Sequence, residues 1–262
     1  QGLFNTVTET ILYEHPLNER IRVFIRLETI YSEIDELMKY DSSTLNRTIV
    51  SLIGDLLSII QRGDLKSEML KELERHIATF SKLRESPDVD AQVLENYLFK
   101  LQEMTARIHS VSGQIGASLK TDEFLSSVIQ RCGIPGGTCD FDLPSLHYWL
   151  TRPTDIRLTK IQQWLGELRL VQETTLRIME LTRSSAFHKE ATAEKGLLQQ
   201  SLEKNHPCQL VQVRLPIEAQ CFPEISGNKH HFTIRFMKTT SGSERPQQVE
   251  ETIPFKLGIC II

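Results

Sequence analysis

The chain has 262 residues, of which 40% are hydrophobic and 24% are charged, and its formal net charge is −4. This length can bury one large core or two modest ones, and the composition is typical of a globular protein. The mildly acidic balance argues against nucleic-acid binding, and no apolar run approaches the ~20 residues needed to cross a bilayer. Residues 1–5 lack the pattern of a secretory signal, and an odd number of cysteines, five, favours reduced thiols. We therefore expect a soluble intracellular protein that binds neither nucleic acid nor a membrane.

Apolar residues recur at intervals of three and four along the first two thirds of the chain, which is the period of an amphipathic helix. Asn18 precedes the first apolar stripe and is a favourable N-cap, because its side chain can accept a hydrogen bond from a free amide of the first turn. The stripes predict helices at residues 18–40, 45–60, 69–83, 93–108, 124–132 and 154–184, with a short segment at 145–150. Long helices joined by short connections favour a bundle with roughly antiparallel neighbours.

After about residue 205 the apolar residues alternate with polar ones, which is the period of a strand with one buried face. The alternation predicts strands at 211–215, 232–236 and 253–261, with turns at 226–228 and 241–243, whereas 187–204 fits either a helix or a hairpin. A sheet of three to five such strands must lie against the helices, because alone it would bury too little apolar surface. The expected fold class is therefore α+β, with an N-terminal helical bundle domain at 12–185 followed by a small antiparallel β-sheet domain at 186–262.

The sequence contains no GxSxG, HExxH, P-loop or GxGxxG motif. The glycine-rich segment 133–138 lacks the Lys-Ser/Thr pair of a phosphate-binding loop, so it predicts a turn. Cys132, Cys139 and His147 lie close enough in the sequence to suggest a Cys/His hydrolase or a zinc-binding protein, although their spacing fits no compact zinc knuckle. This remains the alternative to a binding function.

The predicted strand at 232–236 offers a binding surface. If Phe232, Ile234 and Phe236 point into the core, Arg235 between them points outward. The segment around Arg235 holds more Lys and Arg than Glu, whereas residues 1–185 hold 21 Lys and Arg against 26 Asp and Glu. A local cationic patch on an acidic body suits a short acidic peptide. The alternative is a solvated strand face with scattered charge.

Five segments carry a resemblance to a known family and occur in the same order along the chain. They are Tyr13–Arg20, Leu70–Arg75, Ile134–Pro144, Pro223–Gly227 and Phe232–Met237. The stretch that reads IPGGTCDFDLPSLHYWL, at residues 134–150, is particularly specific. These segments resemble the ZapD family, the Z-ring-associated cell-division proteins of Gram-negative bacteria, and the resemblance runs from about Leu12 to the C-terminus.

The resemblance implies a homodimer without enzymatic activity, cofactor or metal, located in the cytoplasm at the mid-cell division site. The family binds the C-terminal tail of FtsZ, the tubulin-like division GTPase, and bundles its filaments. The helical part would then serve dimerisation and the β domain would serve tail binding. At matching positions, the resemblance places the tail contacts at Arg26, Arg62, His147 and Arg235, with Lys229 and Lys238 as neighbours. Glu123 departs from the pattern, because an enterobacterial relative has Arg there, so one cationic contact differs in this chain.

Overall fold

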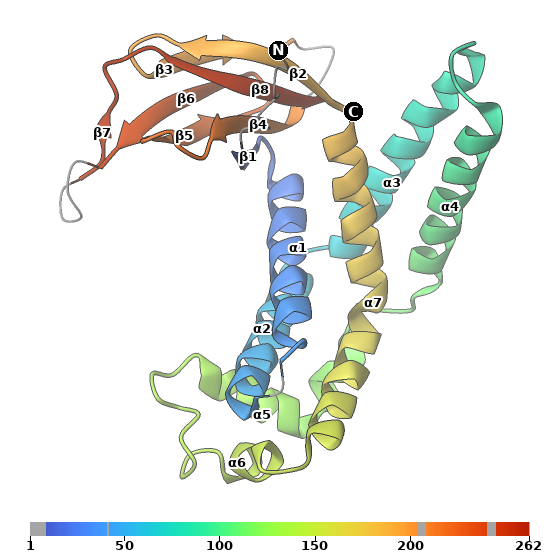
Figure 1. Cartoon of the computed structure of the whole chain (residues 1–262). Helices are drawn as coiled ribbons and strands as arrows, with labels where there is room; N and C mark the ends of the chain where they lie inside the picture. Colours follow the sequence, from blue (N-terminus) through green and yellow to red (C-terminus); the bar gives the residue numbers. More distant parts are fainter. Residues whose placement is uncertain (1–8, 41, 204–207, 240–244, 262) are drawn as a thin grey trace, which may run out of the picture. The chain divides into compact units, whose positions relative to one another are not determined.

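The structure is a computed structural model, and it describes residues 9–40, 42–203, 208–239 and 245–261. The chain forms two compact units (Figure 1): a helical unit, Val23–Ile178, and a β unit made of the described residues of 1–22 and 179–262. The predicted α+β class is confirmed. The two units differ from the predicted ranges, 12–185 and 186–262, because an N-terminal strand and the end of the longest helix belong to the β unit. The N-terminal segment 1–5 and the predicted turn at 241–243 lie outside the described residues.

Helices follow one another between residues 19 and 184. They are α1 (Glu19–Leu37), α2 (Ser43–Gln61), α3 (Leu65–Lys82), the 3-10 turn η1 (Leu83–Glu85), α4 (Ala91–Ser110), the 3-10 turn η2 (Ala117–Thr121), α5 (Glu123–Cys132), α6 (Pro144–Leu150) and α7 (Thr154–Ser184). The predicted helices are confirmed, and the bounds of α7 coincide with the predicted ones. The predicted apolar stripes are buried, as at Ile53 of α2, Leu98 of α4 and Trp164 of α7.

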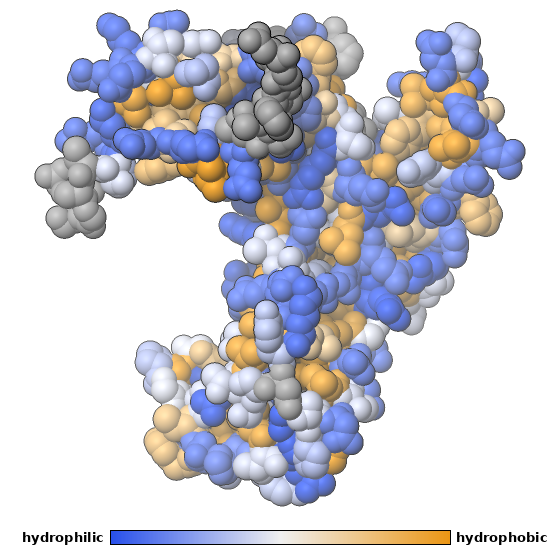
Figure 2. Space-filling view, in the orientation of Figure 1, coloured by the Kyte–Doolittle hydropathy of each residue, from blue (hydrophilic) through white to orange (hydrophobic). Residues whose placement is uncertain are grey.

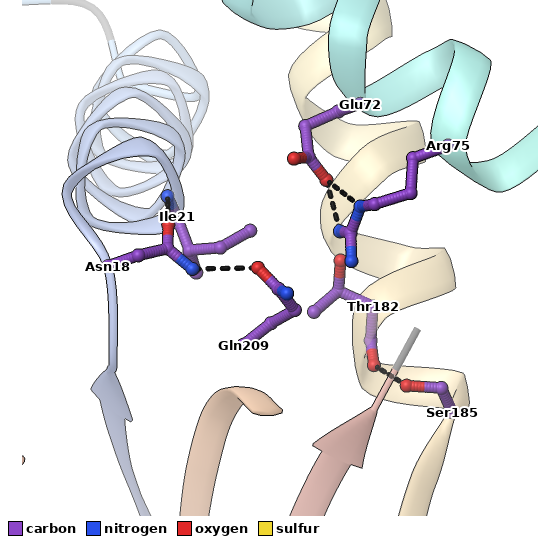
Figure 3. A network of polar contacts seen from close by, with 7 residues as sticks. All are labelled: Asn18, Ile21, Glu72, Arg75, Thr182, Ser185 and Gln209. Carbon is purple, nitrogen blue, oxygen red and sulfur yellow. Dashed lines mark hydrogen bonds and ion pairs between the residues drawn. The ribbon is translucent and has the colours of Figure 1, made fainter. Parts of the chain in front are cut away.

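Asn18 caps α1, as the sequence predicts. Its Oδ1 accepts a hydrogen bond from the backbone N–H of Ile21 at 2.9 Å. Its Nδ2 donates to Oε1 of Gln209 at 2.7 Å, as Figure 3 shows. One side chain therefore satisfies an amide in the first turn of the helix and also connects that turn to a strand of the β unit.

Helix α2 is long and apolar enough, by length and composition alone, to cross a bilayer. It is not an unbroken apolar run of ~20 residues, because polar and charged residues such as Asn46, Arg47 and Asp55 interrupt it. The apolar residues of α2 lie on a stripe that is buried in the helical unit and includes Ile49, Ile53 and Leu57, whereas Asp55 is exposed. This arrangement is typical of the core helix of a folded unit.

Two antiparallel sheets make up the β unit (Figure 1). The first sheet has the strand order β1-β4-β8-β2, and the second has the order β3-β6-β5 with β7 paired to β6. The strands are β1 (Thr10–Pro16), β2 (Ala186–Ala193), β3 (Leu197–Ser201), β4 (Cys208–Pro216), β5 (Phe222–Gly227), β6 (His231–Lys238), β7 (Gln247–Gln248) and β8 (Ile253–Ile261). The three predicted strands are confirmed as β4, β6 and β8. Most of the ambiguous segment 187–204 forms strands rather than a helix.

The core of the β unit lies between its two sheets. Alternate residues of both sheets are buried together, among them Val213 and Phe255 from the first sheet and Phe232 and Phe236 from the second. The rings of Phe236 and Phe255 have centroids 5.0 Å apart. The expectation of one sheet that must lie against the helices is therefore wrong, because each sheet covers the apolar face of the other and supplies the buried area that one small sheet lacks.

Polar side chains cross the other face of the first sheet, away from this core. The Arg183 guanidinium pairs with the Glu14 carboxylate at 2.8 Å, and Nε2 of Gln212 donates to the same carboxylate at 2.8 Å. Nε2 of His188 lies 3.2 Å from Oε1 of Gln212. A Cβ at Gly258 would stand only 2.9 Å from that amide oxygen, so glycine leaves the space that the Gln212 side chain occupies.

Candidate functional site

Arg235 lies on the exposed face of the second sheet, as the alternation predicts. Phe232, Ile234 and Phe236 are buried, and Arg235 between them is exposed. Within the described part of the chain, the Arg235 guanidinium makes no hydrogen bond or ion pair. Its five N–H donors are therefore available for a carboxylate, which a planar guanidinium can bind through two parallel hydrogen bonds.

The neighbours of Arg235 on this face follow from the strand register. Leu197 of β3 and Glu224 of β5 lie directly opposite Arg235 on either side. In the next row on the same face, Met237 of β6 lies opposite Phe222 of β5. Leu197, Phe222 and Met237 are half-buried, so the guanidinium stands beside apolar side chains that are still partly open to solvent. This face combines a site for an anion with a surface for an apolar group.

The structure does not gather the other predicted cations of the β unit around Arg235. Lys229 is exposed in the turn between β5 and β6, and Lys238 ends β6 with its Nζ 3.3 Å from Oε1 of Glu251. An eight-residue strand is about 23 Å long, so Lys229 and Lys238 lie far apart. Because side chains alternate along a strand, Lys238 also points to the opposite face from Arg235. Arg235 is thus the cation that the outer face of β6 presents.

The predicted site residues Arg26, Arg62 and His147 belong to the helical unit. Arg26 is exposed in the second turn of α1. Arg62 is the exposed C-cap residue of α2, and its backbone N–H donates to the carbonyl of Ile59 at 3.4 Å. The carbonyl of the preceding residue, Gln61, accepts a hydrogen bond from Nε2 of Gln114, at 3.4 Å.

Arg62 and His147 are carried by separate parts of the helical unit. Cys132, at the end of α5, lies beside Ser51 in the first half of α2. Helix α6, which carries His147, follows α5 and contacts both α5 and α2 (Figure 1). Helix α2 is about 27 Å long, and Arg62 follows its last turn. Arg62 therefore lies at the other end of α2 from the first half, where Ser51 meets α5.

An aromatic cluster fixes the position of α6. Pro144 starts the helix, and Leu146 is fully buried. The ring of Trp149 packs 5.7 Å from that of Phe124 on α5 and 6.0 Å from that of Trp164 on α7, measured between centroids. Aromatic pairs at these distances add to the stabilisation from area burial. Helix α6 is therefore held on two neighbouring helices although it has only seven residues.

Asp122 fixes the start of α5 against α7. Its carboxylate accepts hydrogen bonds from the indole N–H of Trp164 at 2.9 Å and from Nζ of Lys160 at 2.8 Å. Burial alone would raise the pKa of Asp122, but these bonds and one from a backbone N–H of α5 outweigh it and hold the pKa below its ordinary value. Glu123 follows as an exposed residue in the first turn, where a negative charge is favourable.

His147 is exposed, and two residues close to it in the sequence carry exposed rings. Its Nδ1 lies 3.1 Å from Oδ1 of Asp140, and its side chain is 54% exposed. Phe141 and Tyr148 are also exposed, at 84% and 63%. The Arg152 guanidinium lies over the Tyr148 ring, 5.5 Å from its centroid. This surface offers cationic and aromatic groups side by side, which suits a ligand that carries both acidic and apolar side chains.

The structure does not support the Cys/His alternative. Within the described residues there is no group of three or more His, Cys, Asp or Glu side chains that could hold a metal ion, so the zinc prediction is wrong there. Cys132 is half-buried, and burial raises its pKa, which disfavours the reactive thiolate. Cys139 is exposed, and the ring of His147 contacts Asp140 rather than a thiol.

Sequence reasoning missed the apolar neighbours of the candidate residues. Leu197 and Phe222 lie beside Arg235 only because of the strand register, which no local pattern reveals. Met237 is an exception, because the alternation that places Arg235 on the outward face places Met237 there as well. Phe141 and Tyr148 lie in the segment that carries the most specific resemblance, but their exposure is a property of the folded loop and of α6.

The comparisons with known proteins agree with the resemblance seen in the sequence. The ZapD family model, described as a cell division protein, matches residues 25–235. The "Cell division protein ZapD" of Methylococcus capsulatus is 39% identical over 252 residues, which are 96% of this chain and 98% of that protein. The protein of the same name from Photorhabdus laumondii is 36% identical over 253 residues (97% and 98%), and that from Dechloromonas aromatica is 32% identical over 250 residues (95% and 99%). The chain therefore belongs to the ZapD family of cell division proteins.

Proposed function

We propose that this chain binds the C-terminal tail of FtsZ and, as a homodimer, bundles FtsZ filaments at the division site in the cytoplasm. In this role it is neither an enzyme nor a cofactor-dependent protein. The proposal rests on membership of a cell-division family over almost the whole chain. The observation that carries it is the exposed Arg235 guanidinium, which has no partner within the described residues and is flanked by half-buried apolar side chains.

The chemistry of the Arg235 face fits a flexible acidic peptide. A carboxylate of the peptide accepts two hydrogen bonds from the guanidinium, and an apolar side chain next to it covers Leu197, Phe222 and Met237. Glu224, directly opposite Arg235, repels a second carboxylate on that side and so favours one orientation of the peptide. Each such contact is weak at an exposed site, but filaments present many tails, so avidity multiplies the binding.

The remaining predicted residues are proposed as further contacts of the same tail. Arg26, Arg62 and His147 would act from the helical unit, and Lys229 and Lys238 would act from the ends of β6. Phe141 and Tyr148 would add apolar contacts beside His147, because both rings are exposed there. Lys238 would have to exchange its pairing with Glu251 for a tail carboxylate.

The first experiment measures binding of a fluorescent FtsZ tail peptide by anisotropy. We expect Arg235→Glu to weaken binding at least tenfold, or about 1.4 kcal/mol, because it removes the fork of donors and repels the peptide carboxylate. Lys189→Glu is the control, since it reverses an exposed charge on β2, in the other sheet. Equal affinity of the two folded variants would remove Arg235 from the site.

The second experiment sediments FtsZ filaments with the wild-type chain, using filaments that either carry or lack the C-terminal tail. Low-speed pelleting collects bundles and leaves single filaments in solution. We expect bundles only with intact tails, because the tail is the proposed ligand. Bundling of tail-less filaments to the same extent would show that another FtsZ surface is bound.

A further inference from the structure

Helix α4 packs against α3 through one regular seam. Four leucine and isoleucine side chains of this seam are buried: Leu94, Leu98, Leu101 and Ile108. Half-buried Thr105 completes the spacing of four, three, four and three residues, which is the spacing of a coiled-coil seam. Among the described residues, α4 makes extensive contacts only with α3 and the adjoining η1. One side of α4 is therefore covered within the chain.

A second seam lies beside the first on α4 and is open. Val93 and Tyr97 are 50% and 40% exposed, Lys100 is exposed and Met104 is half-buried. These residues are also spaced by four, three and four, so they form a continuous stripe next to the buried seam. Figure 2 shows hydrophobic residues gathered on the surface of the α3–α4 hairpin. A helix with two adjacent seams is typical of a bundle in which it has two helical neighbours.

The open seam is complementary to itself when two copies run antiparallel. A two-fold axis that passes beside α4 between Leu98 and Phe99 places Val93 opposite Met104 and Tyr97 opposite Lys100, and each of these pairs occurs twice. The first pair is apolar, and the second sets an ammonium group against an aromatic ring, which is attractive. Lys100 makes no ion pair within the described residues, so its ammonium is available for this contact.

The ends of α4 are complementary in the same register. Asp90, the N-cap of α4, falls opposite Arg107 near the C-terminus of the helix in the second copy. Arg107 already pairs with Glu173 of its own chain at 2.9 Å, and Glu173 also pairs with Arg169 at 3.6 Å, so Asp90 would extend this group into a cluster of four charges. Antiparallel helices also set each positive helix terminus beside a negative one.

We propose that α4 pairs antiparallel with α4 of a second copy of this chain, so that two α3–α4 hairpins form a four-helix bundle at the two-fold axis. This inference rests on the proposed function, which requires a homodimer, and it names the surface that forms the dimer. The open seam of α4 in one copy is thus covered by the open seam of α4 in the other copy.

The first test measures the oligomeric state of the full chain by sedimentation velocity across a range of concentrations. Tyr97→Glu places two buried negative charges near the axis, and we expect the dissociation constant of the dimer to rise about 100-fold. Phe99→Glu is the matched control, because Phe99 is 66% exposed on the same helix but lies outside the open seam. Circular dichroism checks that both variants are folded.

The second test fixes the register through a disulfide bond. A chain with both Val93→Cys and Met104→Cys brings two cysteines together at each of the two Val93–Met104 pairs, so mild oxidation gives a covalent dimer. Val93→Cys alone sets a thiol against a methionine and gives no more covalent dimer than the wild-type chain. Equal cross-linking of the single and double variants would overturn the register.

The outcomes separate this inference from the proposed function. A wild-type dimer that Tyr97→Glu leaves as intact as Phe99→Glu does would overturn the α4 surface alone. A wild-type chain that stays monomeric to about 100 μM would overturn both the surface and the dimeric bundling mechanism. Binding of the tail peptide, measured on the same samples, tests the FtsZ contact independently of the oligomeric state.

Discussion

Glu14 and Glu95 make the same kind of ion pair with arginine in different surroundings. Glu14 and Arg183 are only 16% and 30% exposed, whereas Glu95 and Arg84 are 56% and 50% exposed. Burial alone would raise the pKa of Glu14, but hydrogen bonds from Arg183 and Gln212 outweigh it and hold the pKa below its ordinary value. A carboxyl group whose pKa is lowered by folding stabilises the fold above its unfolded pKa and loses that contribution as the pH falls.

We expect Glu14→Gln to lower the free energy of unfolding by about 1–3 kcal/mol at neutral pH, because Arg183 loses a charged partner in a half-buried place. Urea unfolding at pH 7 measures the change. Glu95→Gln is the matched control and leaves the stability nearly unchanged, because both partners of its pair are already in water. The deficit of Glu14→Gln relative to wild type shrinks as the pH falls below 4.5, the ordinary pKa of a glutamate, because the wild-type pair then loses its contribution to stability. A constant deficit between pH 7 and pH 3 would contradict the linkage.

His76 is fully buried in α3, and neither ring nitrogen has a hydrogen-bond partner within the described residues. Burial and the nearby Arg75 charge lower its pKa to about 4. The unfolded chain therefore binds a proton at this residue at a higher pH than the folded chain does. Stability from the neutral ring is complete above about pH 6.5 and is lost as the pH falls toward 4.

We expect this one histidine to remove about 3 kcal/mol of stability between pH 6.5 and pH 4, at about 1.4 kcal/mol for each unit of pKa difference. His76→Leu keeps a side chain at this buried position but removes the titrating group, so its stability falls less steeply over that range. Urea unfolding at half-unit steps of pH gives both curves. His109→Leu, at an exposed position of α4, keeps the wild-type curve. Parallel curves for wild type and His76→Leu would show that other groups dominate the acid response.

At the scale of elements, two glycines have opposite effects on stability. Gly166 is exposed in the interior of α7, and nothing lies within 4 Å of where its Cβ would be. Gly196, in the turn between β2 and β3, has a φ of +67°, and its Cβ would stand 2.5 Å from the carbonyl oxygen of Val249. The first glycine weakens a helix, whereas the second permits a turn.

Alanine at the two positions should therefore have effects of opposite sign. We expect Gly166→Ala to raise the free energy of unfolding by about 0.5–1 kcal/mol, because alanine loses less backbone freedom in a helix. Gly196→Ala should lower it by about 2 kcal/mol or more, through the left-handed φ and the clash with backbone. Thermal unfolding followed by circular dichroism orders the three chains. A stabilised Gly196→Ala variant would mean that the turn relaxes without cost.

The sequence predicts local elements well because their period is a local property. The bounds of α7 follow from its apolar stripe, and the buried face of β6 follows from alternation. Strand β1 was missed because it is paired with β4, which comes far later in the chain, as in the pair of Tyr13 with Val213. The segment of β2 and β3 fitted either a helix or a hairpin in the sequence, because these strands are largely exposed and lack a clear alternation. Pairing between distant segments is thus what the sequence did not reveal.

The candidate site shows the same limit. Arg235 was predicted to face outward, and it does, because parity along one strand decides its direction. The pairing of Lys238 with Glu251 could not be predicted, because Glu251 lies in the connection between β7 and β8, which has no periodic pattern. The resemblance supplied Arg26, Arg62 and His147 as candidates. Only the fold shows that Arg26 is exposed on α1, that Arg62 is the C-cap of α2 and that exposed aromatic residues occur near His147.

At the scale of the whole molecule, filament bundling needs two tail-binding faces in one assembly. One copy of the chain presents one Arg235 face, and a two-fold pair of copies presents two. Once one tail is bound, a second tail on a neighbouring filament meets the other face at a high effective concentration, which can multiply the apparent affinity by about 10²–10⁴. In the proposed mechanism, tail affinity and bundling are therefore separable properties: the first would belong to one copy, and the second to the pair.

We expect Tyr97→Glu to bind a single tail peptide as tightly as the wild-type chain but to leave FtsZ filaments unbundled, because its copies no longer pair through α4. Peptide anisotropy and low-speed pelleting measure the two properties on one preparation.

The oxidised chain with Val93→Cys and Met104→Cys is the converse case. Its covalent dimer should bundle filaments even at concentrations that dissociate the wild-type dimer. Arg235→Glu should still form a dimer, but this dimer should neither bind the peptide nor bundle filaments. If the monomeric Tyr97→Glu chain bundled filaments as well as the wild-type chain, bundling would arise from two tail contacts within one copy, and the two-fold pair would have no part in it.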